Sequence, residues 1–266
     1  MHGEKCYFEK CEKVLLMNTS KTYLITGASS GLGLAVADNL ALKRQKVIAV
    51  ARGEEKLIQL KSSHPDFVSI YTGDLTDDNF LMNLTASLPE KIHGVFINAG
   101  GPPAGRFEDL SISEWDDAYQ LVIRWKIQLI KHLLPVFLKQ NYGRILFSES
   151  TSVTRPVSNL VLSNSLRMSI VGLVRTLVSE YKGTAITFNV LAPGFHETKA
   201  VERVYKKLSD QKNISLTEAK KQLDASIPVG HTGNPQDYAE LASWILSDAA
   251  SFITGQVFNI DGGVSV

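Results

Sequence analysis

The sequence of 266 residues has little cysteine, no excess of either charge and no long apolar run. Its two cysteines, Cys6 and Cys11, lie near the N-terminus without a second pair of metal ligands, which argues against a disulfide framework or a zinc site and favours reduced thiols. The net charge of +1 gives no electrostatic footprint for nucleic acid or an anionic membrane. No stretch is expected to be long enough for a signal-peptide core or a membrane span. These absences predict a soluble, cytoplasmic protein that binds small molecules and no metal.

What the sequence does contain is a regular alternation of apolar strands and amphipathic helices. Strands are expected directly before Gly27 and at residues 46–51, 68–73, 94–98, 143–148, 185–191 and 256–260. Helical patterns lie between them at residues 32–44, 54–62, 77–88, 113–139 and 163–181, and a last helix is expected to begin at Asn234-Pro235. This order predicts an α/β fold with a doubly wound, mostly parallel sheet covered by helices on both faces.

The chain is expected to form a single domain over residues 21–266, preceded by an N-terminal arm over residues 1–20. A polar insert at about 196–227 is interpreted as a lid, in which Ser215 and Glu218 have the spacing of a capping box. The helices at 113–139 and 163–181 carry more apolar surface than one sheet face needs, which predicts a homo-oligomer, either a dimer or a tetramer.

A glycine-rich turn follows the first strand in the stretch T-Y-L-I-T-G-A-S-S-G-L-G. Gly27, Gly31 and Gly33 allow a sharp turn and a close approach of backbone to a ligand, and the N–H groups at the start of the next helix can hold a pyrophosphate. This segment is therefore predicted to bind a dinucleotide, with Ser29, Ser30 and Leu32 as its other cofactor-binding residues.

Residues after the next strands refine this prediction, because ligands of such sheets lie beyond the carboxyl ends of the strands. Arg52 follows the second strand, where an acidic residue would accept from a ribose hydroxyl, and a guanidinium there suits a 2′-phosphate. The predicted cofactor is therefore NADP, with NAD less favoured. Asp74, with Leu75 beside it, follows the third strand and can accept from an adenine amino group.

Together, the motifs T-G-A-S-S-G-L-G, D-L-T-D, N-A-G, P-G and D-G-G resemble the short-chain dehydrogenase/reductases over residues 22–266. The resemblance implies a seven-stranded Rossmann-type sheet, an NAD(P)-binding site, hydride transfer between a nicotinamide and a carbonyl or alcohol, and commonly a homotetramer. It also implies that the cofactor is bound by the loops after the fourth and sixth strands, at Asn98, Ala99, Gly100, Pro193, Gly194 and Thr198.

The catalytic positions depart from the family. The resemblance implies an Asn–Ser–Tyr–Lys set, of which only the serine, Ser150, is present. The Asn position is Val122, and the Tyr and Lys positions hold Ser163 and Arg167, which at this helical spacing lie on one face. A serine hydroxyl is a far weaker acid than tyrosine, and arginine stays protonated. Ser150 and Arg167 are therefore expected to stabilise an oxyanion, while water or the substrate supplies the proton.

Three functions remain open at this point. The first is an NADP-dependent oxidoreductase that reduces a 3-oxoacyl thioester or a small ketone, slowly or by a re-routed proton path. The second is a nucleotide-binding sensor or scaffold, and the third is a non-redox enzyme on the same fold.

Overall fold

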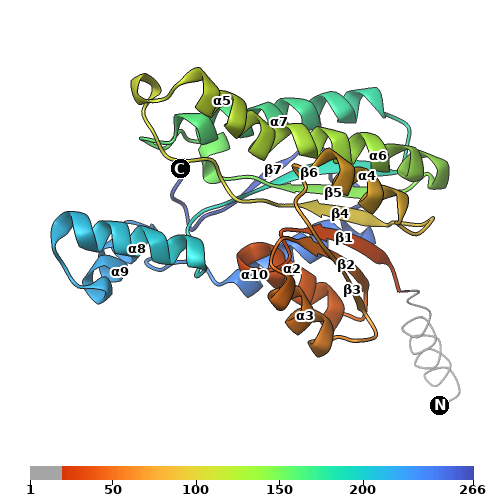
Figure 1. The fold of residues 1–266 in the computed structure, drawn as a ribbon, viewed down its shortest axis with the longest axis horizontal. Coiled ribbons are helices and arrows are strands. Elements are labelled where there is room, and N and C mark those ends of the chain that lie inside the picture. Colours follow the sequence, from red (N-terminus) through yellow and green to blue (C-terminus); the bar gives the residue numbers. More distant parts are fainter. Residues whose placement is uncertain (1–19) are drawn as a thin grey trace, which may run out of the picture.

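The computed structural model describes residues 20–266, which form one parallel sheet between two layers of helices (Figure 1). Of the predicted arm, all but residue 20 lies outside the described residues, as do Cys6 and Cys11. The seven strands have the order β3-β2-β1-β4-β5-β6-β7. They are β1 (Thr22–Thr26), β2 (Lys46–Ala51), β3 (Val68–Thr72), β4 (Gly94–Ile97), β5 (Gly143–Ser148), β6 (Ile186–Pro193) and β7 (Val257–Ile260). All six neighbouring pairs are parallel, so the predicted doubly wound fold is confirmed.

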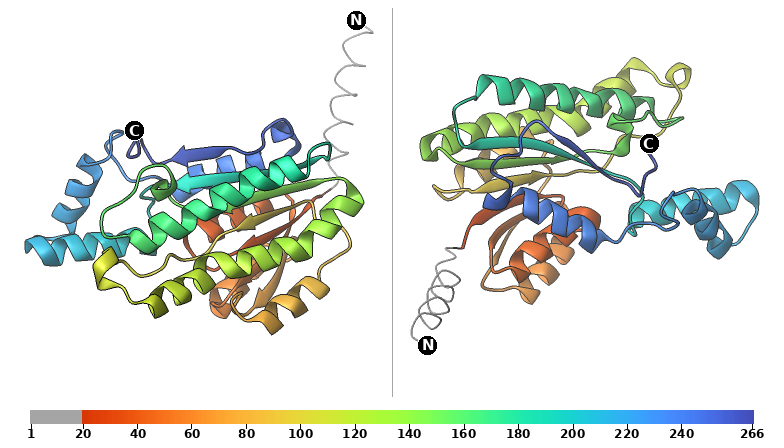
Figure 2. Two further views of the ribbon diagram at one scale, coloured as in Figure 1. Left: turned by 90° about the horizontal axis from the view of Figure 1, so that it is seen from above. Right: turned by 180° about the vertical axis from the view of Figure 1, so that it is seen from behind.

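Helices cover both faces of the sheet, as its buried, apolar strands require. On one face lie α4 (Asp78–Ala86), α5 (Ile112–Tyr119), α6 (Trp125–Gln140) and α7 (Val161–Glu180). On the other face lie α2 (Gly31–Leu42), α3 (Glu54–Ser63) and α10 (Pro235–Ile245), as the view from behind in Figure 2 shows. Asn234 caps α10 through its side chain, and Pro235 is the first residue of the helix, as predicted.

The helix predicted over residues 113–139 is interrupted. Residues Gln120–Arg124 form a π-helical turn, η2, between α5 and α6. Such turns occur mostly as single insertions inside α-helices and are frequent at functional sites. Val122, which stands at the family's Asn position, is buried inside this turn.

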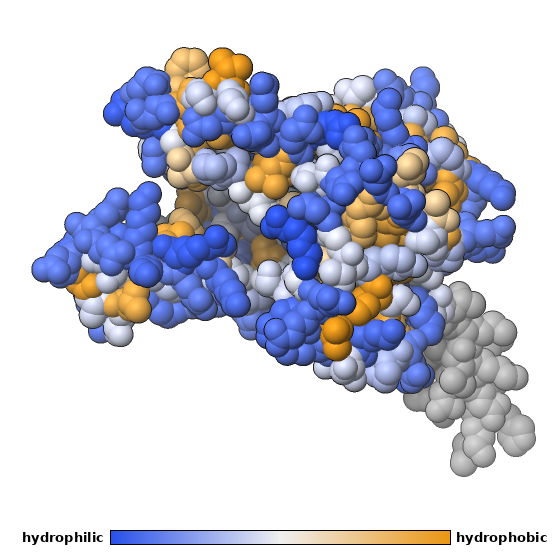
Figure 3. All heavy atoms as spheres, viewed as in Figure 1, coloured by the Kyte–Doolittle hydropathy of each residue, from blue (hydrophilic) through white to orange (hydrophobic). Residues whose placement is uncertain are grey.

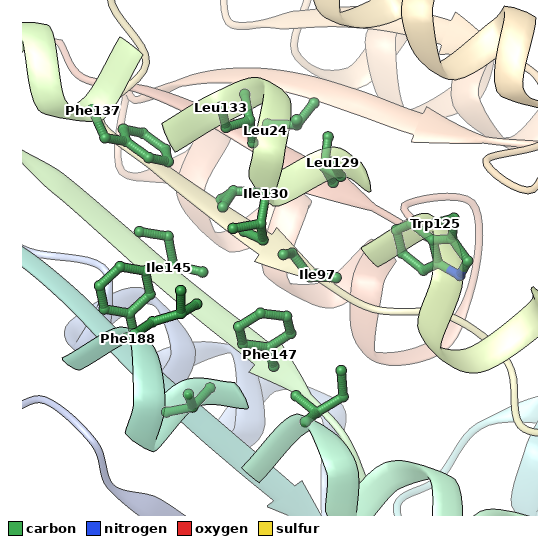
Figure 4. Close-up of a cluster of buried hydrophobic side chains, with 14 of the residues drawn as sticks. Leu24, Ile97, Trp125, Leu129, Ile130, Leu133, Phe137, Ile145, Phe147 and Phe188 are labelled. Carbon is green, nitrogen blue, oxygen red and sulfur yellow. The ribbon is translucent and has the colours of Figure 1, made fainter. Parts of the chain in front are cut away.

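Each face of the sheet has its own apolar core. Figure 4 shows part of the core between the sheet and α6, where large side chains of the helix pack onto strand side chains. The labelled residues are Trp125, Leu129, Ile130, Leu133 and Phe137 of α6, with Leu24, Ile97, Ile145, Phe147 and Phe188 of the strands. Close packing of this kind fixes the height of α6 and α7 above the sheet, and thereby the position of the polar groups at their ends.

The insert predicted as a lid forms α8 (Lys199–Lys212) and α9 (Leu216–Ala225), which pack on each other and project from the body (Figure 1). Its outer surface is mostly hydrophilic, and Figure 3 shows a hollow between this projection and the rest of the molecule. The Ser215 hydroxyl accepts a hydrogen bond from the Glu218 N–H, which is the first half of the predicted capping box. The full, reciprocal box occurs at the start of α5, between Ser111 and Glu114.

One helix departs from the prediction that no stretch is long enough for a membrane span. α7 has the length and composition to cross a membrane, with a mean hydropathy of 1.2. Its apolar residues Ile170, Val174 and Leu177 are buried in the core against the sheet. This placement is that of a core helix.

Candidate active site

A cleft of about 810 Å³ lies at the carboxyl ends of the strands, where the strand order reverses between β1 and β4. This is the place at which open α/β sheets bind ligands. Every predicted site residue except Gly33 lines it. From the cofactor set these are Gly27, Ser29, Ser30, Gly31, Leu32, Arg52, Asp74, Leu75, Asn98, Ala99, Gly100, Pro193, Gly194 and Thr198, and from the catalytic set Ser150, Ser163 and Arg167.

The glycine turn between β1 and α2 forms one wall of the cleft. Gly27 and Gly31 have φ values of +64° and +55°, a conformation that favours glycine. Gly33 lies behind the turn, where an added Cβ would come within 2.2 Å of the Gly27 carbonyl oxygen. The lack of a side chain at Gly33 therefore lets α2 pack against the turn. The Ser30 side chain makes no hydrogen bond to the N–H groups at the start of α2, so it does not occupy the groups that would bind a pyrophosphate.

The ends of β1 and β4 are tied together by Thr26. Its hydroxyl oxygen accepts from the Asn98 N–H at 2.8 Å and donates to the Asn98 carbonyl at 2.9 Å. A Cβ at Gly27 would come within 2.7 Å of the side-chain nitrogen of Asn98, Nδ2, and within 2.8 Å of its backbone carbonyl oxygen. The glycine turn and the segment from Asn98 to Gly100 therefore form one rigid unit at the reversal point.

Arg52 and Asp74 lie side by side at the outer end of the cleft. The Arg52 side chain is 75% exposed, and its Nη1 is 3.4 Å from Asp74 Oδ2. Partial burial raises the pKa of Asp74, but hydrogen bonds from Thr76 and Arg52 outweigh this and lower it below its usual value. Asp74 is therefore an ionised acceptor, and Arg52 keeps N–H groups open to solvent for a second anion.

The segment after β6 forms another wall of the cleft and meets the glycine turn. Gly194 packs against the backbone of Asp261, where a Cβ would be 2.7 Å from Asp261 Cα, and Thr198 lies against Gly31. His196 also lines the cleft but is only 5% exposed, and burial lowers its pKa. It is therefore a neutral imidazole near pH 7.

Ser150 and Ser163 lie at the inner end of the cleft. Ser150 follows β5 and accepts from the Ser152 N–H at 3.1 Å, which leaves its own O–H available as a donor. The Ser163 hydroxyl, on the first turn of α7, lies 3.4 Å from that of Ser152 and accepts from Arg167 Nε at 3.2 Å.

Arg167 is held by a buried carboxylate. Its Nη1 donates to Glu149 Oε2 at 2.9 Å and to the Glu149 carbonyl at 3.1 Å. The other oxygen of that carboxylate, Oε1, accepts from Lys126 Nζ at 2.6 Å. Burial lowers the pKa of Lys126, Glu149 raises it in part, and Arg167 lowers it further. Two cations, Lys126 and Arg167, thus share the Glu149 carboxylate at the inner end of the cleft.

The sequence reasoning missed Lys126 and Glu149. One signal was available for each, since Lys126 is a charged residue on the apolar face of a helix, one turn after Val122, and Glu149 directly precedes Ser150. No tyrosine lines the cleft among residues 20–266. Tyr238 lies behind the cleft wall, where its buried hydroxyl donates to the hydroxyl of Ser148, a lining residue, at 2.8 Å.

Comparisons with known proteins agree with this geometry. A family model described as enoyl-(acyl carrier protein) reductase matches residues 27–265. The chain is 28% identical over 256 residues to the 3-oxoacyl-[acyl-carrier-protein] reductase of Escherichia coli, covering 92% of this chain and 97% of that protein.

Two solved structures are also similar. A variant of actinorhodin polyketide ketoreductase with NADPH is 28% identical, with a TM-score of 0.86 and coverage of 92% of this chain and 97% of that one. Levodione reductase is likewise 28% identical with a TM-score of 0.86, covering 93% and 98%. Fold, strand-end residues and family match agree, and the chain belongs to the short-chain dehydrogenase/reductase family.

Proposed function

We propose that this protein is an NADP-dependent oxidoreductase that reduces the carbonyl group of a small molecule. The observation that carries the proposal is the cleft itself, in which the glycine turn, Arg52, Asp74 and Ser150 lie in one continuous groove across the strand ends. Relatives named as 3-oxoacyl-[acyl-carrier-protein] reductase and a ketoreductase structure with NADPH support the reaction class.

The residues present fit NADP. The glycine turn has no side chains to obstruct a pyrophosphate, and Arg52 offers a fork of N–H donors to a 2′-phosphate. Asp74, ionised and partly exposed, suits an adenine amino group. Asn98, Ala99 and Gly100 would line the nicotinamide ribose, and Pro193, Gly194 and Thr198 the nicotinamide side. Bound NADPH would supply a hydride.

The protein's own contribution at the reacting end is hydrogen bonding to the substrate oxygen. Ser150 has a hydroxyl on the cleft wall, and Arg167 lines the same cleft as a cation held by Glu149, the residue before Ser150. Donors that are held in place for a developing negative charge lower the barrier even where no side chain transfers the proton. Without a tyrosine at the site, water or the substrate supplies the proton, and turnover is slower by about 10²–10⁴-fold than with a positioned acid.

The lid side of the cleft indicates a substrate class. Lys199, Arg203 and Val204 of α8 line it, and neither basic side chain has an ion pair within the described part of the chain. This mixture of apolar and cationic groups suits an acyl chain joined to a phosphate-bearing carrier, as in a 3-oxoacyl thioester, better than a neutral ketone. α8 and α9 would act as the lid over such a substrate.

The helices α6 and α7 would also form the interface of a homo-oligomer. Their outer surfaces expose apolar side chains, among them Leu138 (41%) and Met168 (46%). Sedimentation of the purified protein should therefore give a dimer or a tetramer, and a monomer at micromolar concentration would contradict this part of the proposal.

A carbonyl panel tests the function. The purified protein is mixed with NADPH or NADH and with 3-oxoacyl thioesters or small ketones, and the loss of nicotinamide absorbance is followed. We expect turnover with NADPH and a thioester, faster than with NADH. Binding of NADPH without turnover of any carbonyl would favour a nucleotide-binding sensor instead.

A further inference from the structure

Three charged side chains from three elements form a buried chain that leads from the core to the cleft. Lys126 of α6 has 1% of its side chain exposed, Glu149 after β5 has 0%, and Arg167 of α7 has 7%. Of the three, only Glu149 and Arg167 line the cleft, and Glu149 exposes no side-chain surface there. Arg167 is therefore the only one whose charged group has an edge open to a ligand.

The orientation of Arg167 is fixed by its hydrogen bonds. A guanidinium has five N–H bonds. Four of them have acceptors, namely the Ser163 hydroxyl, two oxygens of Glu149 and, more weakly at 3.5 Å, the Gly100 carbonyl. The remaining N–H is on Nη2, which lies beside Gly101 on the wall of the cleft.

Each oxygen of the Glu149 carboxylate has its own charged partner. Arg167 donates to Oε2 at 2.9 Å, and without a donor on Oε1 the carboxylate would be free to turn away from Arg167. Lys126 supplies the donor for the second oxygen at 2.6 Å. Stability alone does not account for a lysine at this place, since apolar residues of similar volume often replace buried charge clusters without loss.

We propose that Lys126 and Glu149 are positioning residues, in which Lys126 fixes the orientation of the Glu149 carboxylate and Glu149 holds Arg167 with one Nη2 N–H facing the reacting end of the cleft. The inference rests on the proposed function, in which Arg167 donates to the substrate oxygen. An inner charged group that orients an outer, reacting one is an established arrangement in catalytic and metal-bound histidine sites.

Substitution of the innermost residue tests the inference. Lys126→Met has nearly the same length and removes a buried cation that touches no ligand. We expect kcat to fall about 10–100-fold, as for loss of other supporting residues around a site, while NADPH affinity stays unchanged. Arg124 lies two residues before Lys126 and forms an exposed ion pair with Asp78. Arg124→Gln breaks that pair, so it is the matched control and should keep the kcat of the original protein. An unchanged kcat in Lys126→Met would overturn the inference.

A double variant separates positioning from simple charge balance. Lys126→Met with Glu149→Gln removes one cation and one anion together, so it should fold with a higher Tm than Glu149→Gln alone. If the cluster positions Arg167, the double variant has a low kcat in spite of its regained stability. If the cluster only balances charge, the double variant regains full kcat, and the inference is wrong.

A readout that needs no turnover keeps this test distinct from that of the proposed function. The rate at which phenylglyoxal modifies Arg167, followed by mass spectrometry of its peptide, should be higher in Lys126→Met and in the double variant than in the original protein. Equal rates would show that Arg167 does not depend on Lys126. If the original protein turns over no carbonyl, the proposed function fails, but these rates still decide whether Lys126 and Glu149 hold Arg167 in place.

Discussion

Glu149→Gln should have a large effect on the free energy of unfolding, and its size can be worked out from the structure. Glutamine has almost the same shape, but it removes the negative charge between Lys126 Nζ at 2.6 Å and Arg167 Nη1 at 2.9 Å. Loss of one partner from a buried ion pair costs about 3–5 kcal/mol, and here two cations lose their anion at once. At about 2–4 °C per kcal/mol, Tm should fall by roughly 6–20 °C.

Urea unfolding followed by circular dichroism, together with thermal scans, measures this effect. Glu240→Gln, in an exposed pair with Lys43, is the control and should change Tm far less. A Tm for Glu149→Gln within about 2 °C of that of the original protein would refute the reasoning.

The lowered pKa of Lys126 predicts how the free energy of unfolding changes with pH. Burial, as the largest cause, lowers the pKa of Lys126 in the folded protein below its ordinary value of 10.5. Between the two pKa values the unfolded chain binds a proton that the folded protein does not, so this group makes stability rise with pH across that window. Lys126→Met should lack this rise, and an identical pH profile in the variant would contradict the assignment.

Three further predictions concern the cofactor and the substrate oxygen. Arg52→Ala should weaken NADPH binding about 10–100-fold, the loss of one or two charged hydrogen bonds, and leave NADH binding unchanged; equal effects on both, measured by fluorescence titration, would exclude a role at the 2′-phosphate. Ser150→Ala should lower kcat about 10²–10³-fold without changing NADPH affinity, whereas the exposed Ser165→Ala on α7 should keep full activity. Gly33→Ala places a Cβ 2.2 Å from the Gly27 carbonyl oxygen and should abolish NADPH binding, while Gly172→Ala, with nothing within 4 Å, should bind normally and unfold at the same or a higher temperature.

Much of the fold could be predicted from local patterns. The strand at β2 and the strand at β5 were predicted with their observed bounds, because continuous apolar runs between polar turns define buried parallel strands. The residues after each strand could also be assigned to one site, because parallel strands all end at one edge of the sheet.

The inner end of the cleft could not be predicted in this way. Lys126 and Glu149 are 23 positions apart and lie on different elements, and their pairing depends on the height at which α6 packs on the sheet. The break of the predicted helix at Gln120–Arg124 is equally invisible in the sequence, because the apolar residues before and after the π turn continue a helical period. Local patterns give the place of a residue on its element, whereas the partner of a buried charge is set by tertiary packing.

The proposed function requires that this cleft transfer a hydride to a carbonyl carbon although no tyrosine lines it within residues 20–266. Hydride transfer is measured most directly with NADPH carrying deuterium at the transferring position of the nicotinamide, a 3-oxoacyl thioester and mass spectrometry of the product. We predict one deuterium on the carbon that bears the new hydroxyl group. Unlabelled product, or no product from a protein that binds NADPH, would contradict the claim.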